Sequence, residues 1–164
     1  MSLIWNREHD QYVLRQLLAL AERDASAAGE TAFPAEAAEF KRRMAGELPA
    51  DWDSKSAEFV AATDAKGESL ATRQASLKAI EGYAPVLPEI FGGSADLGCS
   101  NLTEWSGYKP MRADKPESNY VNYGVREFGM SAIVNGLALH GGIIPYAGTF
   151  LQFADYSRPA IRLG

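Results

Sequence analysis

The first 67 residues carry apolar side chains at the spacing of amphipathic helices, separated by short polar breaks. Helices are predicted over three stretches, residues 3–21, 35–47 and 51–60. Pro34 suits the first turn of the second helix, and Pro49 ends it. The run from Thr63 to Gly67 is interpreted as a linker. Because the region contains no chemical motif, residues 1–67 are predicted to form a helical linker arm.

The pattern changes after residue 67, where short apolar runs alternate with helical patterns. Helices are predicted over residues 69–83 and 127–140 and from residue 150 onward, and strands over residues 89–91, 120–123 and 143–146. Residues 99–119 contain glycine and proline breaks and are predicted to form a loop. Alternating strands and helices favour an α/β fold with parallel strands, which places a second domain at residues 68–164. Helix 127–140 is almost entirely apolar and is therefore predicted to be buried.

The predicted sheet is incomplete. Two or three short strands make only a partial doubly wound parallel sheet, and a parallel sheet needs cover on both faces. We therefore expect its edges to be completed by another chain or by further sequence.

Composition narrows the classes of function. Apolar residues form 46% of the 164 residues, enough for a core, and the net charge is −5. The absence of a long basic cluster argues against binding to nucleic acid or to an anionic membrane. A single cysteine, Cys99, excludes an intrachain disulfide, and two histidines, His9 and His140, leave little for a histidine-based metal centre. No apolar run reaches the ~18 residues of a membrane span, so a cytoplasmic protein is expected.

One carboxylate lies at the N-terminal end of the predicted apolar helix. Glu127 follows the predicted strand 120–123 and a glycine turn at Gly124. In one interpretation it is a first-turn acid, which the helix dipole stabilises by about 0.3–1 kcal/mol. In the other it is a buried glutamate with a raised pKa, able to share a proton with a ligand. The residues around it leave both interpretations open.

Three aromatic side chains in the last helix are spaced at i, i+3 and i+6. Phe150, Phe153 and Tyr156 can line one side of that helix as a stacking surface for a flat heterocycle. Packing in the core is the alternative.

Other candidates lie on turns and helices. The segment Gly92–Asp96 follows a predicted strand, and strand ends are where ligands bind in α/β sheets, although a tight structural turn is the alternative. Arg73 and Arg126 are candidate binders of phosphate or carboxylate groups, or solvated helix residues.

Five motifs, in this order, resemble the transketolase family. They are Ala71-Thr-Arg73, Gly92-Gly-Ser-Ala-Asp-Leu-Gly-Cys-Ser-Asn-Leu-Thr103, Tyr123-Gly-Val-Arg-Glu127, Pro145-Tyr-Ala-Gly-Thr-Phe150 and the aromatic helix that follows. Each motif alone is weak, but five in order with compatible spacing are not expected by chance. The resemblance runs from about Trp5 to the end of the chain, weakly before Ser69 and strongly after it.

The resemblance implies a thiamine-diphosphate enzyme that moves a two-carbon ketol unit between phosphorylated sugars in the pentose phosphate pathway. Such enzymes are homodimers in which a diphosphate-binding domain of one subunit meets a pyrimidine-binding domain across the interface. The chain resembles the linker after the first domain together with the start of the second.

The resemblance also implies roles for individual residues. Glu127 matches the catalytic glutamate, which hydrogen-bonds the aminopyrimidine ring nitrogen and favours its imino form. The ring pocket and the contacts near it match five positions, Asp96, Leu97, Phe150, Phe153 and Tyr156. Arg73 and Ser100 match residues that hold the sugar phosphate, through a charged fork and a hydroxyl donor.

Departures from the family pattern limit these expectations. Gly98-Cys99 replaces a small residue and a proline before Ser100, and Pro159 interrupts the last helix. No Gly-Asp-Gly motif with a downstream asparagine is present, so the ligands for magnesium and the diphosphate are expected outside this chain. The chain alone is therefore expected to be inactive. A non-catalytic docking module and a related enzyme such as dihydroxyacetone synthase remain the alternatives.

Overall fold

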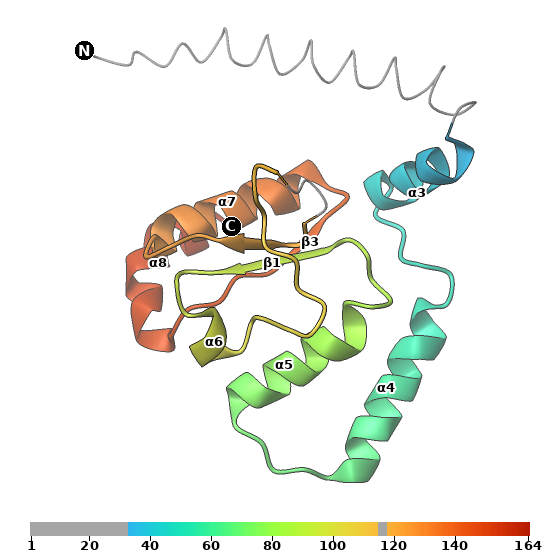
Figure 1. The fold of residues 1–164 in the computed structure, drawn as a ribbon, viewed down its shortest axis with the longest axis horizontal. Coiled ribbons are helices and arrows are strands. Elements are labelled where there is room, and N and C mark those ends of the chain that lie inside the picture. The colour runs from blue at the N-terminus through green and yellow to red at the C-terminus, as the bar shows by residue number, and fades with distance from the viewer. Residues whose placement is uncertain (1–32, 115–117) are drawn as a thin grey trace, which may run out of the picture. The chain divides into compact units, whose positions relative to one another are not determined.

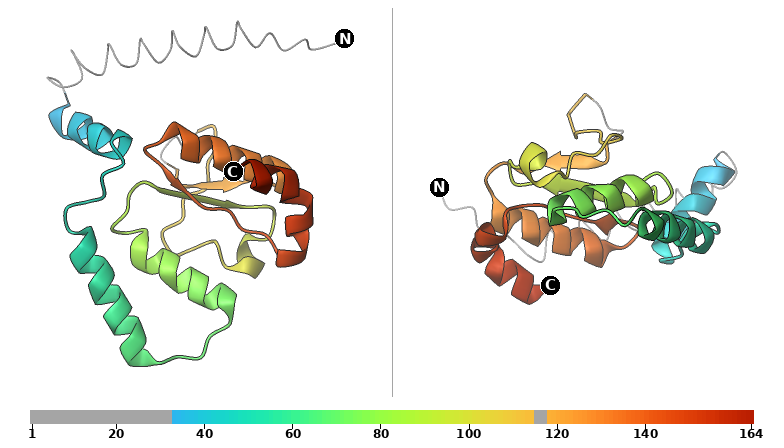
Figure 2. Two further views of the ribbon diagram at one scale, coloured as in Figure 1. Left: turned by 180° about the vertical axis from the view of Figure 1, so that it is seen from behind. Right: turned by 90° about the horizontal axis from the view of Figure 1, so that it is seen from below.

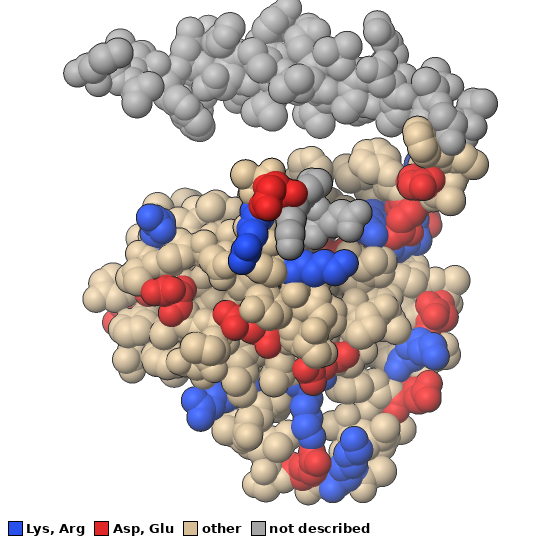
Figure 3. Space-filling view, viewed as in Figure 1, with Lys and Arg blue, Asp and Glu red and all other residues tan. Residues whose placement is uncertain are grey.

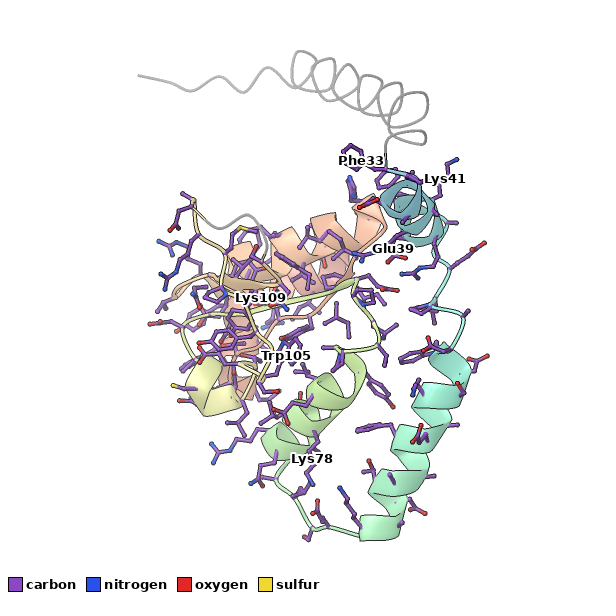
Figure 4. The ribbon with its side chains drawn as sticks, turned by 45° about the vertical axis from the view of Figure 1, so that its right-hand side comes forward. Phe33, Glu39, Lys41, Lys78, Trp105 and Lys109 are labelled. Carbon is purple, nitrogen blue, oxygen red and sulfur yellow. The ribbon has the colours of Figure 1, made fainter. Side chains whose placement is uncertain are left out.

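The computed structural model describes residues 33–114 and 118–164, so the helix predicted over residues 3–21 lies outside the described residues. The chain divides into two compact units, residues 1–42 and 43–164. Helix α3 (Pro34–Met44) begins at the predicted proline and ends three residues earlier than predicted. Within it Arg42 donates to Glu39 across one turn at 2.7 Å, and Figure 4 labels Phe33, Glu39 and Lys41 in this segment.

Helix α4 (Trp52–Lys66) is longer than predicted, so the linker interpretation of Thr63–Gly67 is wrong for its first four residues. Ala65 and Lys66 favour helix there, and Gly67, at φ 55°, ends the helix in the left-handed conformation. Helix α5 (Thr72–Tyr83) packs its Tyr83 ring against Phe59 of α4 at 4.7 Å between ring centroids. Lys78, labelled on α5 in Figure 4, pairs with Glu68.

Three parallel strands form the sheet, in the order β2-β1-β3 (Figure 1). They are β1 (Ile90–Ser94), β2 (Tyr120–Asn122) and β3 (Ile144–Pro145). Gly92 pairs with Tyr120 on one side of β1, and Ile90 pairs with Ile144 on the other. The predicted α/β class with a partial parallel sheet is confirmed.

The two glycines after the predicted strand 89–91 do not form a turn, as one interpretation held, but continue β1. Gly92 and Gly93 are both buried. A Cβ atom at Gly92 would overlap the ring of Tyr146, and one at Gly93 would overlap the ring of Tyr123. Glycine is required here because aromatic rings fill the space that a side chain would occupy.

The predicted loop 99–119 contains a short helix, α6 (Gly98–Asn101), which the glycine and proline pattern did not indicate. Two non-glycine residues in the left-handed conformation bracket it, Asp96 at φ 61° and Leu102 at φ 59°. The Leu102 amide closes α6 by donating to the carbonyl of Gly98. The chain therefore turns sharply on both sides of these four residues.

Helix α7 (Glu127–His140) has the predicted bounds, but the prediction that it is buried is wrong. Only Glu127 and Met130 are buried, while Leu139 is 88% exposed. In Figure 1 the strands pass in front of α7, and in the view from behind α7 lies in front of them (Figure 2). A three-stranded sheet and one neighbouring helix cover only part of its circumference, which leaves the remaining apolar side chains in solvent.

The last segment is a 3-10 turn, η2 (Leu151–Phe153), followed by α8 (Ala154–Leu163). The helix continues through Pro159. A small core of Ala95, Tyr123 and Met130 joins β1, β2 and α7.

On the face shown in Figure 3, acidic and basic side chains are interspersed. Among the described residues no helix combines the length and the apolar character that crossing a membrane requires.

Candidate functional site

The predicted site residues follow the carboxyl ends of the three strands. Because the strands are parallel, these ends lie at one edge of the sheet. Asp96 and Leu97 follow β1, Glu127 follows β2, and Phe150 follows β3. Residues from three separate segments of the chain therefore lie at the edge where α/β sheets bind ligands.

Glu127 is the first residue of α7 and is only 7% exposed. Among the residues that the structure describes, its carboxylate has no hydrogen-bond or ion-pair partner. The helix start accommodates a negative charge, as the dipole interpretation requires. Most of the side chain is buried, but its oxygens are not among the fully buried atoms that lack a partner, so they remain open to solvent and to a ligand. This combination favours the interpretation of Glu127 as a ligand-facing group.

Helices α7 and α8 run in the same direction side by side. Ser131 donates to Ser157 at 2.9 Å, and one turn further along each helix the Asn135 amide donates to the carbonyl of Ala160 at 2.7 Å. Asn135 follows Ser131 in α7, and Ala160 follows Ser157 in α8. The two helices are therefore parallel, with their N-terminal ends at the same side. These hydrogen bonds set the register between Glu127 and the aromatic residues at the start of α8.

The three aromatic rings form a row, although not along one helix as predicted. Phe150 precedes η2, Phe153 is the residue before α8, and only Tyr156 lies within α8. The rings of Phe150 and Phe153 are stacked at 6.0 Å and 22°, and those of Phe153 and Tyr156 are tilted at 6.2 Å and 36°. Phe150 and Tyr156 are exposed. A row of partly exposed rings can stack on a flat ligand.

An open groove of about 670 Å³ brings together predicted residues that lie far apart in the sequence. Arg73 from α5, Ser100 from α6 and Phe150 all line it. One Arg73 nitrogen donates to the Ser100 carbonyl at 3.2 Å, which fixes the guanidinium beside α6. An arginine has five N–H donors, so most of its binding capacity stays open to an anion.

The other predicted residues do not line this groove. Asp96, Leu97, Glu127, Phe153 and Tyr156 lie outside it. Within the described ranges there is no group of three or more acidic, histidine or cysteine side chains that could hold a metal ion.

The second arginine considered from the sequence has an internal partner. Arg126 donates to the carbonyl of Tyr123 at 2.9 Å, and its side chain covers Gly124, which has a φ of 65°. Its guanidinium therefore stabilises the turn that leads into α7.

A network of side-chain hydrogen bonds borders the groove and was not predicted from the sequence. Ser94 Oγ donates to the Gly148 carbonyl and accepts from the amide of Leu97 and from Asn101 Nδ2, each at 3.1 Å. Thr103 Oγ1 donates to Asn101 Oδ1 at 2.9 Å. Ser94, Asn101 and Thr103 belong to the Gly92–Thr103 motif, but the sequence analysis assigned no role to them.

Two further hydroxyl groups belong to the groove region. Tyr146 OH donates to the carbonyl of Thr103 at 3.0 Å. Thr149 lines the groove, and its buried Oγ1 has no hydrogen-bond partner among the described residues. Neither residue was singled out from the sequence.

Burial raises the pKa of the tyrosines that surround the network. Desolvation raises the pKa of Tyr120, against an opposing hydrogen bond with Thr103, and it also raises the pKa values of Tyr123 and Tyr146 above the usual 10.0. A raised pKa in the folded chain means that these residues contribute stability below about pH 10, and that this contribution is lost as the pH rises.

We expect a delayed ionisation of tyrosine in the folded chain. Absorbance at 295 nm, followed from pH 8 to 13, should show a late step that coincides with loss of circular dichroism. Tyr146→Phe should reduce the late step, since it removes one of the desolvated phenols. In guanidinium chloride all tyrosines should ionise together near pH 10. A single step near pH 10 in the folded chain would contradict the burial argument.

Comparison with known proteins assigns the family. The family model described as the transketolase pyrimidine-binding domain matches residues 68–164. Transketolase 1 of Escherichia coli is 56% identical over 137 residues, which are 84% of this chain and 20% of the relative. Transketolase 1 of Vibrio cholerae is 55% identical over 137 residues, 84% of this chain and 21% of the relative. The chain thus spans about a fifth of the length of these relatives.

Solved structures agree. The transketolase of Leishmania mexicana superposes with a TM-score of 0.67 at 38% identity, covering 95% of this chain and 21% of that one. A Pichia stipitis transketolase in complex with sedoheptulose 7-phosphate gives a TM-score of 0.70 at 34% identity, covering 95% and 23%. Since the domain match includes more than half of its residues, the chain belongs to the transketolase family.

Proposed function

We propose that this chain supplies the pyrimidine-side half of a transketolase active site, in which a two-carbon ketol unit passes between phosphorylated sugars. The observation that carries the proposal is the shared sheet edge: Glu127, Ser100 and Phe150 each follow the carboxyl end of a parallel strand. Arg73, from the preceding helix α5, lines one groove with Ser100 and Phe150. Bound thiamine diphosphate would supply the carbanion chemistry of the transfer.

Glu127 is proposed as the catalytic acid–base residue. Most of its side chain is buried, and the lack of a partner among the described residues leaves its oxygens available for a ring nitrogen. A protonated or shared carboxyl group can donate a hydrogen bond to such a nitrogen and take the proton back. These features fit an aminopyrimidine better than a structural ion pair.

Phe150, Phe153 and Tyr156 are proposed to hold the pyrimidine ring, with Asp96 and Leu97 near it. The stacked pair and the tilted third ring offer faces and edges to a flat heterocycle. The parallel register of α7 and α8 supports placing these rings on the same side as Glu127.

Arg73 and Ser100 are proposed to hold the phosphate of the sugar substrate. They lie in one groove and are already linked through the Ser100 carbonyl. The planar guanidinium can bind phosphate oxygens with two parallel hydrogen bonds. The solved relatives with sedoheptulose 7-phosphate and xylulose 5-phosphate support this class of substrate.

The remaining parts of the site are proposed to come from outside this chain. Magnesium and the diphosphate would be held by a diphosphate-binding domain, which the described residues do not provide. A homodimer in the cytoplasm, with the site at the subunit interface and a role in the pentose phosphate pathway, completes the proposal. The exposed apolar side chains of α7 and α8, such as Leu139 and Leu163, are consistent with further protein contacts.

A chimaeric enzyme tests the proposal. In it, this chain replaces the matching 137-residue segment of the Escherichia coli relative. Ketol transfer from xylulose 5-phosphate, with thiamine diphosphate and magnesium, is expected for the chimaera and not for the chain alone. Activity of the chain alone would contradict the division of the site between two parts. A folded chimaera without activity would favour the non-catalytic docking module, and activity with formaldehyde as the preferred acceptor would favour a dihydroxyacetone synthase.

Replacing Phe153 by alanine should weaken cofactor binding in the chimaera. Loss of one stacked ring is worth roughly 1–3 kcal/mol, so the Kd for thiamine diphosphate should rise about 5- to 150-fold. Quenching of intrinsic fluorescence during a titration measures it. The matched control is Phe59→Ala, which removes the ring contact between Phe59 of α4 and Tyr83 of α5 and should leave the Kd unchanged. Equal affinities in both variants would rule out a stacking role.

A further inference from the structure

One buried hydroxyl connects the segments that carry the groove. Ser94, at the carboxyl end of β1, is 2% exposed. Its single proton goes to the Gly148 carbonyl, and its two lone pairs accept from Leu97 N and from Asn101 Nδ2. A serine hydroxyl has one donor and two acceptor sites, so all of its capacity is used.

Each of the three partners stands beside a residue of the proposed site. Leu97 begins the turn into α6, and Asn101 follows Ser100 directly in α6. Gly148 lies two residues before Phe150. Its carbonyl also accepts from the amide of Ala95 at 3.1 Å, so both of its lone pairs are used, by the last residue of β1 and by the residue after it.

The connection extends to Arg73 through α6. Its guanidinium donates to the carbonyl of Ser100, whose neighbour Asn101 is held by Ser94. Displacement of α6 would therefore move Ser100 and the Arg73 guanidinium, both of which line the groove. Among the described side chains, Ser94 is the one that accepts a hydrogen bond from the amide of Leu97.

We infer that Ser94 is a positioning residue, whose buried hydroxyl holds α6 and the segment before Phe150 at the spacing that the substrate groove requires. The inference rests on the proposed function, because it concerns the same groove. Ser94 does not touch the substrate: it acts through Asn101, Leu97 and Gly148.

Ser94→Ala in the chimaeric enzyme tests the inference. It leaves two donors and one acceptor without their partner, so the KM for xylulose 5-phosphate should rise by about tenfold or more at saturating cofactor. Because the groove binds substrate away from the reacting atoms, kcat should stay nearly unchanged. Hydrogen–deuterium exchange at the Leu97 amide should accelerate by a similar factor, since that amide loses its acceptor.

Two variants keep the test decisive. Asn101→Ala removes one of the three Ser94 bonds, together with the bond that Asn101 accepts from Thr103, and should raise KM while leaving the Leu97 exchange rate unchanged. Leu87→Val truncates a buried side chain that precedes the opposite end of β1, and should lower stability without changing KM. A KM that rises equally in Leu87→Val, or an unchanged KM and Leu97 exchange in Ser94→Ala, would overturn the inference. If the unmodified chimaera lacks ketol transfer, the proposed function fails, and the Leu97 exchange rate still decides whether Ser94 holds α6.

Discussion

Replacing Glu127 by glutamine is expected to lower kcat of the chimaeric enzyme by about 10²–10⁴-fold, the range that a positioned acid–base group contributes. Glutamine keeps the size of the side chain but cannot exchange a proton with a ring nitrogen. The fold should survive, because the carboxylate has no partner among the described residues that the substitution would strand. Stopped-flow measurement of ketol transfer, with circular dichroism of the same sample, gives both quantities.

The matched control is Glu58→Gln, which makes the same chemical change at an exposed position of α4. It should leave kcat unchanged. If Glu127→Gln retained full activity while both variants remained folded, Glu127 would be a helix-terminal acid and the proposed mechanism would fail. If it instead unfolded the protein, Glu127→Asp offers a second measurement, since it keeps the carboxylate and shortens its reach.

Replacing Gly92 by alanine is expected to destabilise the chain by about 1–3 kcal/mol or more, the usual cost of overpacking. The added Cβ overlaps the ring of Tyr146, which hydrogen-bonds to the carbonyl of Thr103 and cannot move freely. Urea unfolding followed by circular dichroism should show a lower midpoint with an unchanged slope.

Gly136→Ala provides the opposite control in the same molecule. Gly136 lies inside α7, and a Cβ there meets no heavy atom within 4 Å. Because alanine favours helix by up to about 1 kcal/mol over glycine, the midpoint should rise. A double variant, Gly92→Ala with Tyr146→Ala, should lose less than the sum of the single losses. Additive losses would show that the Tyr146 ring is not the obstacle.

Local sequence patterns predicted the elements whose boundaries have a local cause. The apolar run 127–140 has a glycine turn before it and Gly141 after it, and both of its ends were located correctly. The prediction of burial failed, because burial depends on what surrounds a helix rather than on its own composition. The same limit explains β1: Gly92 and Gly93 indicate a turn by local preference, whereas tertiary packing of two tyrosine rings places them in a strand.

Much of the candidate site could be predicted because its residues belong to recognisable motifs. The structure adds how they meet. Arg73 and Ser100 are 27 positions apart and share a groove through a hydrogen bond. The bonds of Ser94 could not be predicted from the sequence, since its partner Gly148 is 54 positions away and no periodic pattern indicates the contact.

The left-handed residues on either side of α6 make this segment sensitive to length. Asp96 and Leu102 reverse the chain at fixed points, and only the helical turn between them separates the proposed cofactor side from the proposed phosphate side. One inserted or deleted residue would rotate Ser100 by about 100° about the helix axis and break the hydrogen bond between its carbonyl and Arg73. Between Asp96 and Leu102, natural variation should therefore appear as exchanges of side chains and hardly ever as insertions or deletions.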